Sequence, residues 1–593
     1  MRRKLLAAVL AVLLLATGCA TVPTKGTIRN AGREGLAPDF GGVGVEAKPP
    51  RADAQPLQLV NGFLEAMSDS RAFDVARQYL TPEAAAAWKP ESQTVVYQQA
   101  RDAVSSVRAD QVRLRAGMIA AIDDRGSWTP AKVDARVDFT FKLVKVDGQW
   151  RVATPPPGVY LSSNQLDPKL APRNLYFFNP GKDMLVPDPV YLPVNLSAGQ
   201  AATQLVQELL KGPTRRLGNG AISLAPPGTA VQVSVPVEVG VATVALNEAA
   251  APLRDTERRL LAAQIVWTLN QINLRVKITV SGAPLLPDEP DVLPFSNFGN
   301  YDPQVPDGAM TELFGVRSGR IQRIEGLDGA SDIAARPLNS SRLYDYQAES
   351  FAVSLRGDSG AIVTTEDGDK VVAYARLEST EDDKSEQVRK IQTEGRVLRP
   401  SFDNQDNLWV LDRADGPVPR LRVRNRDGTA LADVTTSFHG DAPVALRMAP
   451  DGVRALLVMR SKTTGENYVQ TGTIQTASGG KLVLGQLRQL QLPLTAITDA
   501  AWNKLGILVA GTSPDVGNMR QPWLVNTDGS GRQLLPGASS GFETALLASN
   551  LNKDTLPVVE DVKGQLHWQT RDLTWVDMDN DANAAPIVPT YPG

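Results

Sequence analysis

The chain has 593 residues, more than one hydrophobic core accommodates, so the sequence predicts two to four domains. Hydrophobic residues make up 42% and charged residues 21%, which excludes a largely disordered chain and a polytopic membrane protein. A formal net charge of −3 excludes nucleic-acid binding through excess positive charge. One cysteine, Cys19, and two histidines, His439 and His567, exclude disulfides, zinc fingers and multi-histidine metal cages, and we expect no cofactor.

Residues 1–19 have the parts of an export signal. Three basic residues are followed by eleven apolar ones from Leu5 to Leu15, too few to span the hydrocarbon core of a membrane. The segment ATGC that ends at Cys19 resembles the lipobox of bacterial lipoproteins, although leucine is more usual at Ala16. The resemblance implies a diacylglyceryl thioether on Cys19 and an acyl chain, such as palmitate, on its amine. An ordinary signal peptide with an incidental cysteine is the alternative.

The segment 20–55 is rich in glycine, proline and small polar residues and has no hydrophobic periodicity. This composition predicts a flexible tether between the anchor and the folded body. No later stretch approaches the length of a transmembrane helix, so the lipid on Cys19 is the only membrane attachment that the sequence predicts.

Residues 56–158 are predicted to form an α+β domain. Helical spacing of apolar residues indicates a first helix, a second is expected to end at Tyr79, and Thr81-Pro82 is a cap for a third. Alternating apolar residues from Val133 to Leu143 indicate a strand, and Asp147-Gly148 a hairpin turn. Helices followed by a sheet that ends in VDGQWRV resemble the NTF2-like fold. Without a histidine for acid–base work, we expect a scaffold or interaction role.

Residues 159–300 are predicted to form a second α+β domain. Strands are expected near 175–178, around Val231, Val233 and Val235, from Val239 to Val244 and from Val276 to Val280, with helices between them. The segments LYFFNPGKDMLVP, ELLKGPTR, VATVALNE, IVWTLNQI and VKITVSGAPL resemble the GerMN domain in order and spacing, which implies a fold of exported envelope proteins without catalytic apparatus. The acidic residues Asp288, Glu289 and Asp291 are interpreted as a solvated loop.

Residues 301–593 contain a repeat. Segments that start near 351, 397, 444, 497 and 546 each have an apolar strand, a polar turn and a second strand, at spacings typical of β-propeller blades. Residues 312–325 are expected to close the ring with C-terminal strands. The sequence therefore predicts an all-β propeller of five or six blades.

Two serine motifs in this domain resemble the sequences around the nucleophilic serines of known hydrolases. Ser359 lies in GDSG, the tetrapeptide around the nucleophile of chymotrypsin-like proteases, but no histidine precedes it to act as a base. Ser539 lies in a G-x-S-x-G pattern, followed by Glu560, Asp561 and His567 in hydrolase order. That pattern needs a strand and a helix of an α/β fold on its two sides, whereas antiparallel repeats surround it. We therefore expect turns and loops at both sites, and no catalytic residue.

Metal sites are also disfavoured. Asp577, Asp579, Asp581 and Asn583 follow the first positions of a calcium loop, but Ala582 replaces its glycine and Val588 its last carboxylate. His439 lies in a loop with no second ligand at metal spacing.

The whole order of parts resembles the actinobacterial LpqB lipoprotein family: lipobox, tether, a first domain with VNGFLEAM and YLTPEAAAAW, GerMN domain and propeller. The resemblance implies a protein on the extracytoplasmic face of the cell membrane. It also implies a partner, the sensor domain of an MtrB-type histidine kinase, and modulation of that two-component system, with effects on envelope and division. The alternatives are a protein that binds cell-wall glycan or peptide, and an envelope hydrolase that uses the propeller channel.

Overall fold

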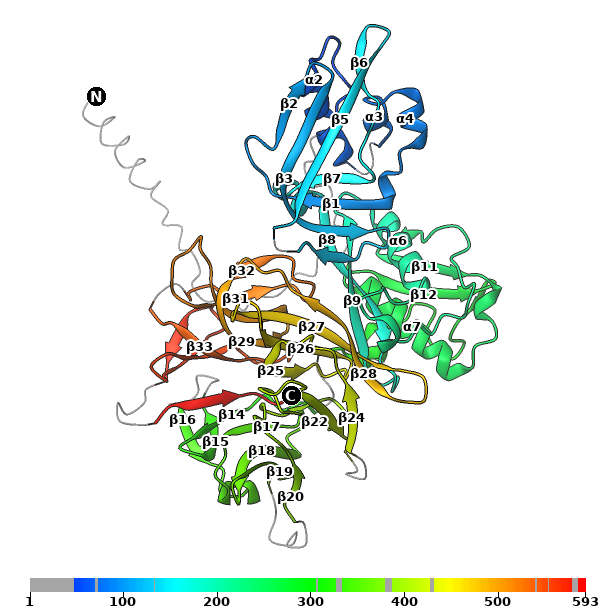
Figure 1. The fold of residues 1–593 in the computed structure, drawn as a ribbon. Coiled ribbons are helices and arrows are strands. Elements are labelled where there is room, and N and C mark those ends of the chain that lie inside the picture. Colours follow the sequence, from blue (N-terminus) through cyan, green and yellow to red (C-terminus); the bar gives the residue numbers. More distant parts are fainter. Residues whose placement is uncertain are drawn as a thin grey trace, which may run out of the picture. The chain divides into compact units, whose positions relative to one another are not determined.

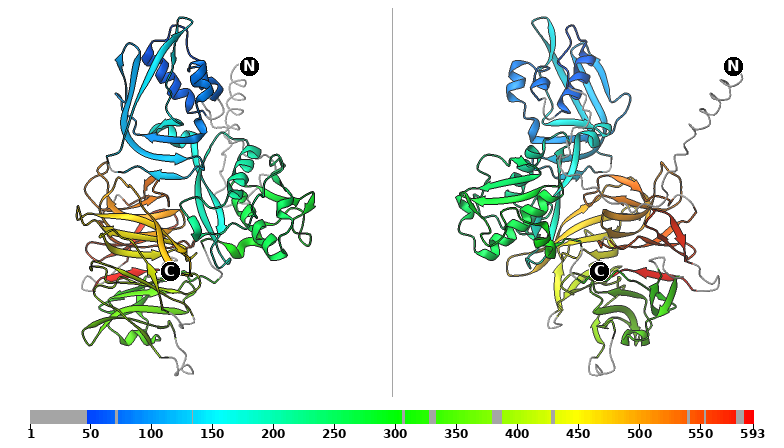
Figure 2. Two further views of the ribbon diagram at one scale, coloured as in Figure 1. Left: turned by 45° about the vertical axis from the view of Figure 1, so that its right-hand side comes forward. Right: turned by 180° about the vertical axis from the view of Figure 1, so that it is seen from behind.

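The computed structural model describes the chain from residue 47 to residue 593. Within that range it leaves out residues 70–72, 133, 305–307, 327–332, 379–386, 427–430, 539–540, 553 and 579–584. The predicted signal peptide, Cys19 and most of the predicted tether therefore lie outside the described residues. Figure 1 labels the helices and strands, and Figure 2 shows the same ribbon from two further sides.

Three helices begin the first domain: α2 (Pro56–Met67), α3 (Phe73–Arg77) and α4 (Pro82–Ala87). The apolar face predicted for α2 is buried. The Thr81 hydroxyl accepts a hydrogen bond from the Ala84 amide at 3.2 Å, as the predicted cap requires. The second helix stops earlier than predicted, because the amides of Gln78 and Tyr79 bond three residues back, in a tighter turn than the α-helix.

Seven strands form the first sheet, with the path β6-β5-β3-β1-β7 and with β2 and β4 paired to β3. The predicted hairpin turn is present, because Asp147 and Gly148 both have positive φ between β5 and β6. The sequence analysis missed β1 to β4, and the parallel pairing of β7 with β1 carries the sheet beyond residue 158. The strands are β1 (Gln93–Tyr97), β2 (Val104–Arg108), β3 (Gln111–Asp123), β4 (Trp128–Pro130), β5 (Arg136–Val146), β6 (Gln149–Val152) and β7 (Val159–Ser162).

The second domain is built on a parallel strand pair joined by a helix. Strands β11 (Val241–Leu246) and β12 (Arg275–Val280) pair in parallel, and α7 (Asp255–Asn270) connects them and packs on β12. Phe177, Leu205, Leu261 and Ile265 belong to one fully buried core. The remaining elements are α5 (Ser163–Lys169), β8 (Leu170–Phe178), β9 (Leu185–Pro193), α6 (Ala198–Leu210), β10 (Val237–Glu238) and β13 (Ala283–Pro284).

The strand predicted through Val231, Val233 and Val235 is wrong. Val231 makes only an isolated bridge to Leu246, and Val233 is 87% exposed. The amide of Val235 donates to the Thr203 hydroxyl of α6 at 2.9 Å, so it is not available to a strand partner. Val239 has a φ of 48° and lies in the turn before β11, not in the predicted strand.

Short 3-10 helices occur at connections throughout the described chain: η1 (Pro90–Ser92), η2 (Gly218–Gly220), η3 (Glu248–Ala250), η4 (Phe295–Tyr301) and η5 (Arg342–Asp345). Side-chain hydrogen bonds also link the second domain to the propeller. The Tyr191 hydroxyl bonds the Ser530 hydroxyl at 2.5 Å, and the Asn179 amide donates to the Asp451 carbonyl at 3.2 Å.

In the described residues the propeller has six blades of four strands that are antiparallel within each blade, which agrees with the predicted five or six. One parallel strand pair joins the third and fourth blades into an eight-stranded sheet. Blade 1 contains β14 (Leu313–Arg317), β15 (Arg320–Glu325), β16 (Ala334–Pro337) and β37 (Ile587–Thr590). Blade 2 contains β17 (Ser350–Val353), β18 (Ser359–Glu366), β19 (Asp369–Arg376) and β20 (Arg389–Gln392). Blade 3 contains β21 (Ser401–Phe402), β22 (Leu408–Asp412), β23 (Arg420–Arg424) and β24 (Leu431–Thr435).

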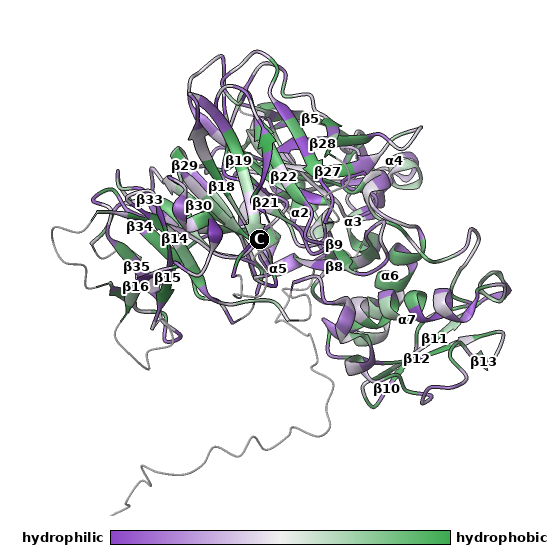
Figure 3. Ribbon diagram, turned by 90° about the horizontal axis from the view of Figure 1, so that it is seen from below, coloured by the Kyte–Doolittle hydropathy of each residue, from purple (hydrophilic) through white to green (hydrophobic). Residues whose placement is uncertain are grey.

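The other three blades follow in chain order. Blade 4 contains β25 (Ala442–Met448), β26 (Arg454–Arg460), β27 (Asn467–Thr476) and β28 (Leu482–Gln489). Blade 5 contains β29 (Thr495–Asn503), β30 (Gly506–Thr512), β31 (Gln521–Val525) and β32 (Arg532–Leu534). Blade 6 contains β33 (Thr544–Ala548), β34 (Val558–Asp561), β35 (Leu566–Gln569) and β36 (Trp575–Asp577). Figure 3 shows hydrophobic and hydrophilic residues interspersed along these strands.

The ring closes as the sequence predicts. The C-terminal strand β37 pairs with β14, so both ends of the domain contribute to blade 1. The five repeated segments are the first two strands of blades 2 to 6. Their polar turn residues have a local cause. Asp403, Asp451, Asn503 and Asn552 each accept a hydrogen bond from a backbone amide two residues later, which fixes the hairpin turn.

Candidate functional site

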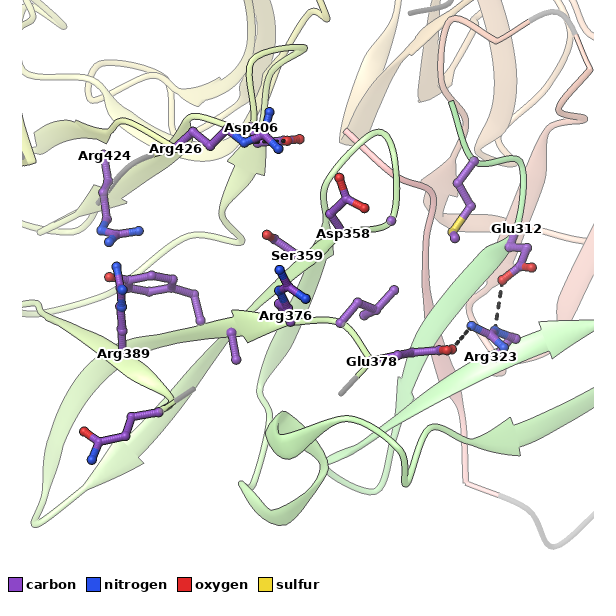
Figure 4. A pocket seen from close by; sticks show the side chains of 16 residues that line it. Glu312, Arg323, Asp358, Ser359, Arg376, Glu378, Arg389, Asp406, Arg424 and Arg426 are labelled. Atoms are coloured by element: carbon purple, nitrogen blue, oxygen red, sulfur yellow. Dashed lines mark hydrogen bonds and ion pairs between the residues drawn. The ribbon is translucent and has the colours of Figure 1, made fainter. Parts of the chain in front are cut away.

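A cavity of about 830 Å³ is lined by residues of blades 1, 2 and 3 of the propeller. Figure 4 shows that its charged side chains converge from strands far apart in the sequence. The charged lining consists of Arg323, Arg376, Arg389, Arg424, Arg426, Glu312, Asp358, Glu378 and Asp406. A cavity of this size with so many ionic groups is suited to a charged ligand rather than an apolar one.

One wall of the cavity begins on β23, where arginine alternates with other residues from Arg420 to Arg426. Side chains alternate between the two faces of a strand, so the arginines share one face. Leu421 and Val423, on the other face, belong to an apolar core. The arginine face is directed toward blade 2, because Arg424 lies over the Tyr374 ring of β19.

The first two arginines of this row are structural. Arg420 and Arg422 both reach the carboxylate of Asp412, at 2.5 Å and 3.0 Å, and Asp412 is fully buried. Arg422 also donates to the Gln392 carbonyl of blade 2 at 2.8 Å. Their charges are thus compensated inside the blade, and neither lines the cavity.

The next arginine of the row lacks such a carboxylate. The Arg424 guanidinium lies 4.0 Å from the centroid of the Tyr374 ring, and Arg389 is hydrogen-bonded to the same tyrosine. Burial lowers the pKa of Arg424, and the positive charge of Arg389 lowers it further. Among the described residues, neither Arg389 nor Arg424 has a carboxylate within ion-pair distance. Two like charges therefore share one aromatic ring at the cavity wall.

Asp406 is the carboxylate beside Arg426, and the charge of Asp358 also reaches it. The nearest oxygen of Asp406 lies 3.8 Å from the Arg426 Nε, a loose ion pair. Burial raises the pKa of Asp406 above the usual value of an aspartate, the charges of Arg426 and Arg356 oppose that rise, and the charge of Asp358 adds to it. Among the described residues, Arg389, Arg424 and Arg426 together with Asp406 carry a formal charge of +2; we call these four residues the cationic end.

The opposite side of the cavity is acidic. Arg323 of blade 1 is placed between Glu312, at 2.9 Å, and Glu378. Figure 4 shows this trio on the far side of Asp358 from Arg389 and Arg424. The trio has a formal charge of −1; we call these three residues the acidic end, and Asp358 lies between the two ends. The cavity is thus bipolar, with opposite charges at its two ends.

The structure describes one of the two serine motifs. Ser359 lies at the start of β18, directly after a hairpin turn, and borders the cavity. No histidine lines this cavity in the described chain. Ser539 lies outside the described residues, in the connection between blades 5 and 6.

His567 has a structural environment. Its Nδ1 lies 2.6 Å from the Asp577 carboxylate and its Nε2 3.2 Å from that of Asp561, while the ring stacks on Phe542 at 4.3 Å. A general base needs a free ring nitrogen to receive a proton. Both nitrogens are already engaged by carboxylates, so His567 is not positioned to activate a serine. Burial raises the pKa of Glu560 to about 7, and the charge of Asp561 adds to that rise.

Two of the acidic residues interpreted as a solvated loop form ion pairs, and the residues considered as metal ligands are engaged elsewhere or lie outside the described residues. Glu289 pairs with Arg259 and Asp291 with Lys277, each at 2.7 Å. Asp577 contacts His567, whereas Asp579, Asp581, Ala582 and Asn583 lie outside the described residues. The exposed His439 is 3.4 Å from the Ser437 hydroxyl. In the part of the chain that the structure describes, no group of three or more His, Cys, Asp or Glu side chains is placed to hold a metal ion.

Cys19, the predicted lipidation site, lies outside the described residues. None of the helices between residues 47 and 593 that the structure describes has the length and apolar character of a membrane span.

Sequence reasoning missed the cationic end. The segment RLRVRNR, from 420 to 426, contained a usable signal, because arginine at every second position of a strand predicts one charged face. The contribution of Arg389 could not be found in this way, because blade 2 brings it to β23 only in the closed ring.

Three protein-family models match the chain in sequence order. Residues 49–167 match "Lipoprotein LpqB, N-terminal domain", residues 174–286 match "Sporulation and spore germination", and residues 335–592 match "Lipoprotein LpqB beta-propeller domain". Together with the strand order, these matches confirm the predicted fold class of two α+β domains, the second GerMN-like, followed by a β-propeller.

Curated relatives extend the match to nearly the full length. Lipoprotein LpqB of Cutibacterium acnes is 28% identical over 97% of this chain and 98% of its own. Lipoprotein LpqB of Streptomyces coelicolor is 28% identical over 98% of this chain and 96% of its own. The names of these relatives describe lipoproteins and no enzyme.

Solved structures match single domains. TolB from Acinetobacter baumannii is 13% identical with a TM-score of 0.35, covering 49% of this chain and 68% of TolB. The first GerMN domain of the sporulation protein GerM from Bacillus subtilis is 23% identical with a TM-score of 0.18, covering 21% of this chain and 96% of that domain.

Proposed function

The chain belongs to the LpqB lipoprotein family, and from that premise we propose that it is a lipid-anchored extracytoplasmic protein that binds the sensor domain of an MtrB-type histidine kinase and modulates its signalling. The proposed role is binding, without catalysis. The observation that carries it is the charged cavity of the propeller, whose arginines and tyrosine are the residue types enriched at protein interfaces.

The proposed anchor is the lipid on Cys19. The family name supports a lipoprotein, and the lipobox resemblance supplies the residue. In cells fed a palmitate analogue that carries a chemical tag, the wild-type chain should be labelled and sediment with membranes. Cys19→Ala should be unlabelled. Equal labelling of the variant would show that another residue carries the lipid.

Modulation needs only a difference in affinity. If the lipoprotein binds one conformation of the sensor domain more tightly than the other, it shifts the population toward that conformation. A tenfold difference, about 1.4 kcal/mol, is enough for a tenfold shift. The direction of regulation then depends on which kinase conformation is bound.

The first test is direct binding of soluble residues 20–593 to the purified sensor domain of the cognate kinase. Saturable binding with a micromolar or lower Kd is the expected result. No binding at high micromolar concentrations, with a preparation that melts cooperatively, would reject the kinase as the partner. Deleting residues 301–593 is a poor way to map the contact, because it exposes Tyr191 and Asn179, which bond the propeller.

The hydrolase alternative requires one carboxyl group that donates a proton and another that remains ionised. In the cavity, Glu312 and Glu378 both form ion pairs with the same Arg323, an arrangement that fixes the two side chains on one cation. Incubation with purified cell walls separates the remaining possibilities. Retention on walls without release of fragments would favour glycan or peptide binding, and release of soluble fragments would favour an enzyme.

A further inference from the structure

We propose that the bipolar cavity of blades 1 to 3 binds a mixed-charge peptide segment of a protein, with acidic side chains at the cationic end and a basic side chain at the acidic end. This goes beyond the kinase-binding function and does not depend on it, because a peptide can be tested without the kinase. Four observations support it.

The first observation is positive charge that the described part of the chain leaves uncompensated. Arg389 and Arg424 share Tyr374 and repel each other, which costs free energy in the unliganded protein. A carboxylate bound between them would remove that repulsion. The same row of β23 places Arg420 and Arg422 on a carboxylate, so this strand face can hold guanidinium–carboxylate pairs.

The second observation is the type of cation. Arginine presents a planar fork of N–H donors that matches the two oxygens of a carboxylate. The ring of Tyr374 holds the Arg424 fork in place from one side, which reduces the conformational entropy lost on binding. Lysine side chains, which would suit a less specific anion, do not appear in the described cavity lining.

The third observation is the acidic end. A long polyanion that filled the cavity would place negative charge beside Asp358 and the Glu312–Arg323–Glu378 trio, where it is repelled. A ligand with an acidic part and a basic part matches both ends. This charge pattern selects a mixed-charge peptide over a polyphosphate or another uniformly anionic polymer.

The fourth observation is the size of the cavity. Its volume of about 830 Å³ lies in the range of sites that enclose a ligand, roughly 300–1,000 Å³. The lining comes from three blades of a closed ring, so the walls are fixed in position before binding. A short extended segment with a few charged side chains fits this space better than a single ion does.

The test uses four dye-labelled synthetic peptides of equal length and the full chain in detergent micelles. Two peptides carry two glutamates, a Gly-Ser spacer and two lysines, in the two possible orders. The third has only glutamates and the fourth only lysines at the charged positions. Fluorescence anisotropy in 150 mM NaCl should show one mixed-charge peptide binding at least 10-fold more tightly than either uniform peptide.

Variants locate the binding. Arg424→Gln and Arg389→Gln should each weaken the mixed peptide by roughly 10-fold, the loss expected for one charge-assisted hydrogen bond. Arg424→Lys, which keeps the charge but not the fork, should fall between wild type and Arg424→Gln. The matched control is Arg460→Gln, which removes an exposed arginine of blade 4 outside the cavity and should leave the Kd unchanged.

Each contrary result overturns a defined part of the proposal. Equal binding of the all-glutamate and mixed peptides would remove the role of the acidic end. Unchanged binding by Arg424→Gln and Arg389→Gln would place the peptide elsewhere. No binding of either mixed peptide by a chain that melts cooperatively would reject the cavity as a peptide site. Binding of the peptides without binding of the sensor domain would leave this proposal standing and reject the kinase as partner.

Discussion

The two halves of the arginine row on β23 differ in one respect, the carboxylate beside them. Arg420 and Arg422 converge on the buried Asp412 of the neighbouring strand β22. Arg424, on the same face, has Tyr374 and the like charge of Arg389 instead. The same residue type on one strand therefore supports the blade at one end and offers charge to a ligand at the other. What separates a structural arginine from a binding arginine here is whether its partner lies within the fold.

We expect the largest loss of stability from removing the carboxylate that holds Arg420 and Arg422, the structural half of the arginine row. Asp412→Asn leaves Arg420 and Arg422 without their shared carboxylate, and Arg422 is buried. Breaking a buried ion pair by removing one partner costs about 3–5 kcal/mol. Urea denaturation should show a loss of that order in the free energy of unfolding.

The control for this change is Asp369→Asn, which removes an exposed aspartate of β19 in blade 2. It should alter the free energy of unfolding by no more than about 0.5 kcal/mol. Similar losses for both variants would show that the Asp412 carboxylate is not what gives Arg420 and Arg422 their structural role.

The second prediction concerns the pH dependence of stability at Asp403, a buried carboxylate whose described hydrogen-bond donors are all neutral. Asp403 accepts hydrogen bonds from the Trp409 indole at 2.9 Å, the Asn407 side chain and two backbone amides, all of them neutral donors. Burial raises the pKa of Asp403 to about 6, and these hydrogen bonds only partly oppose the rise. Asp412, in contrast, is surrounded by arginines.

The sign of the pH effect follows from this rise. A carboxyl whose folded pKa lies above its unfolded value binds its proton more tightly in the folded state, so its contribution to stability is greatest below pH 4 and falls until about pH 6. From a rise of about two pKa units, wild type should lose about 3 kcal/mol relative to Asp403→Asn over that window. Parallel melting temperatures of the two proteins from pH 4 to pH 7 would contradict this.

The third prediction concerns the binding half. Arg424→Gln removes a cation–π contact, which contributes about 0.5–1 kcal/mol, and also the repulsion with Arg389, which offsets part of that loss. The free energy of unfolding should therefore change by less than about 1 kcal/mol while peptide binding weakens. A loss as large as that of Asp412→Asn would show that Arg424 is structural too.

The sequence predicts more of the fold than of the candidate site. Periodicity found α2, α6, α7 and β12, because each buries residues at its own regular spacing. It failed around Val233, where β-branched residues suggested a strand but the neighbouring amide bonds Thr203 of a helix. Tertiary partners decide such positions, and a single sequence does not reveal them.

The candidate site shows the same limit. The alternation RLRVRNR predicts an arginine face, but nothing in that segment tells Arg420 from Arg424. The distinction depends on Asp412, eight residues earlier than Arg420 in the chain, and on Tyr374 from another blade. The GDSG motif around Ser359 lies at the hairpin turn between β17 and β18, and its Asp358 lines the cavity, whereas the arginines and glutamates of the lining belong to no catalytic motif.

The smallest expected effect is the coupling between Arg389 and Arg424. In a double-mutant cycle with Arg389→Gln and Arg424→Gln, the double variant should be less stable than the sum of the two single effects predicts, because that sum counts the relief of the repulsion twice. The difference should be a few tenths of a kcal/mol, the size usual for charge pairs that solvent reaches. Screening should abolish this coupling in 1 M NaCl, where the Debye length is about 3 Å, and leave the cost of Asp412→Asn nearly unchanged. The wall of the cavity is open to salt and the Asp412 carboxylate is not, so the same titration measures both halves of the row. A coupling of opposite sign would mean that Arg389 and Arg424 attract a shared anion even without an added peptide.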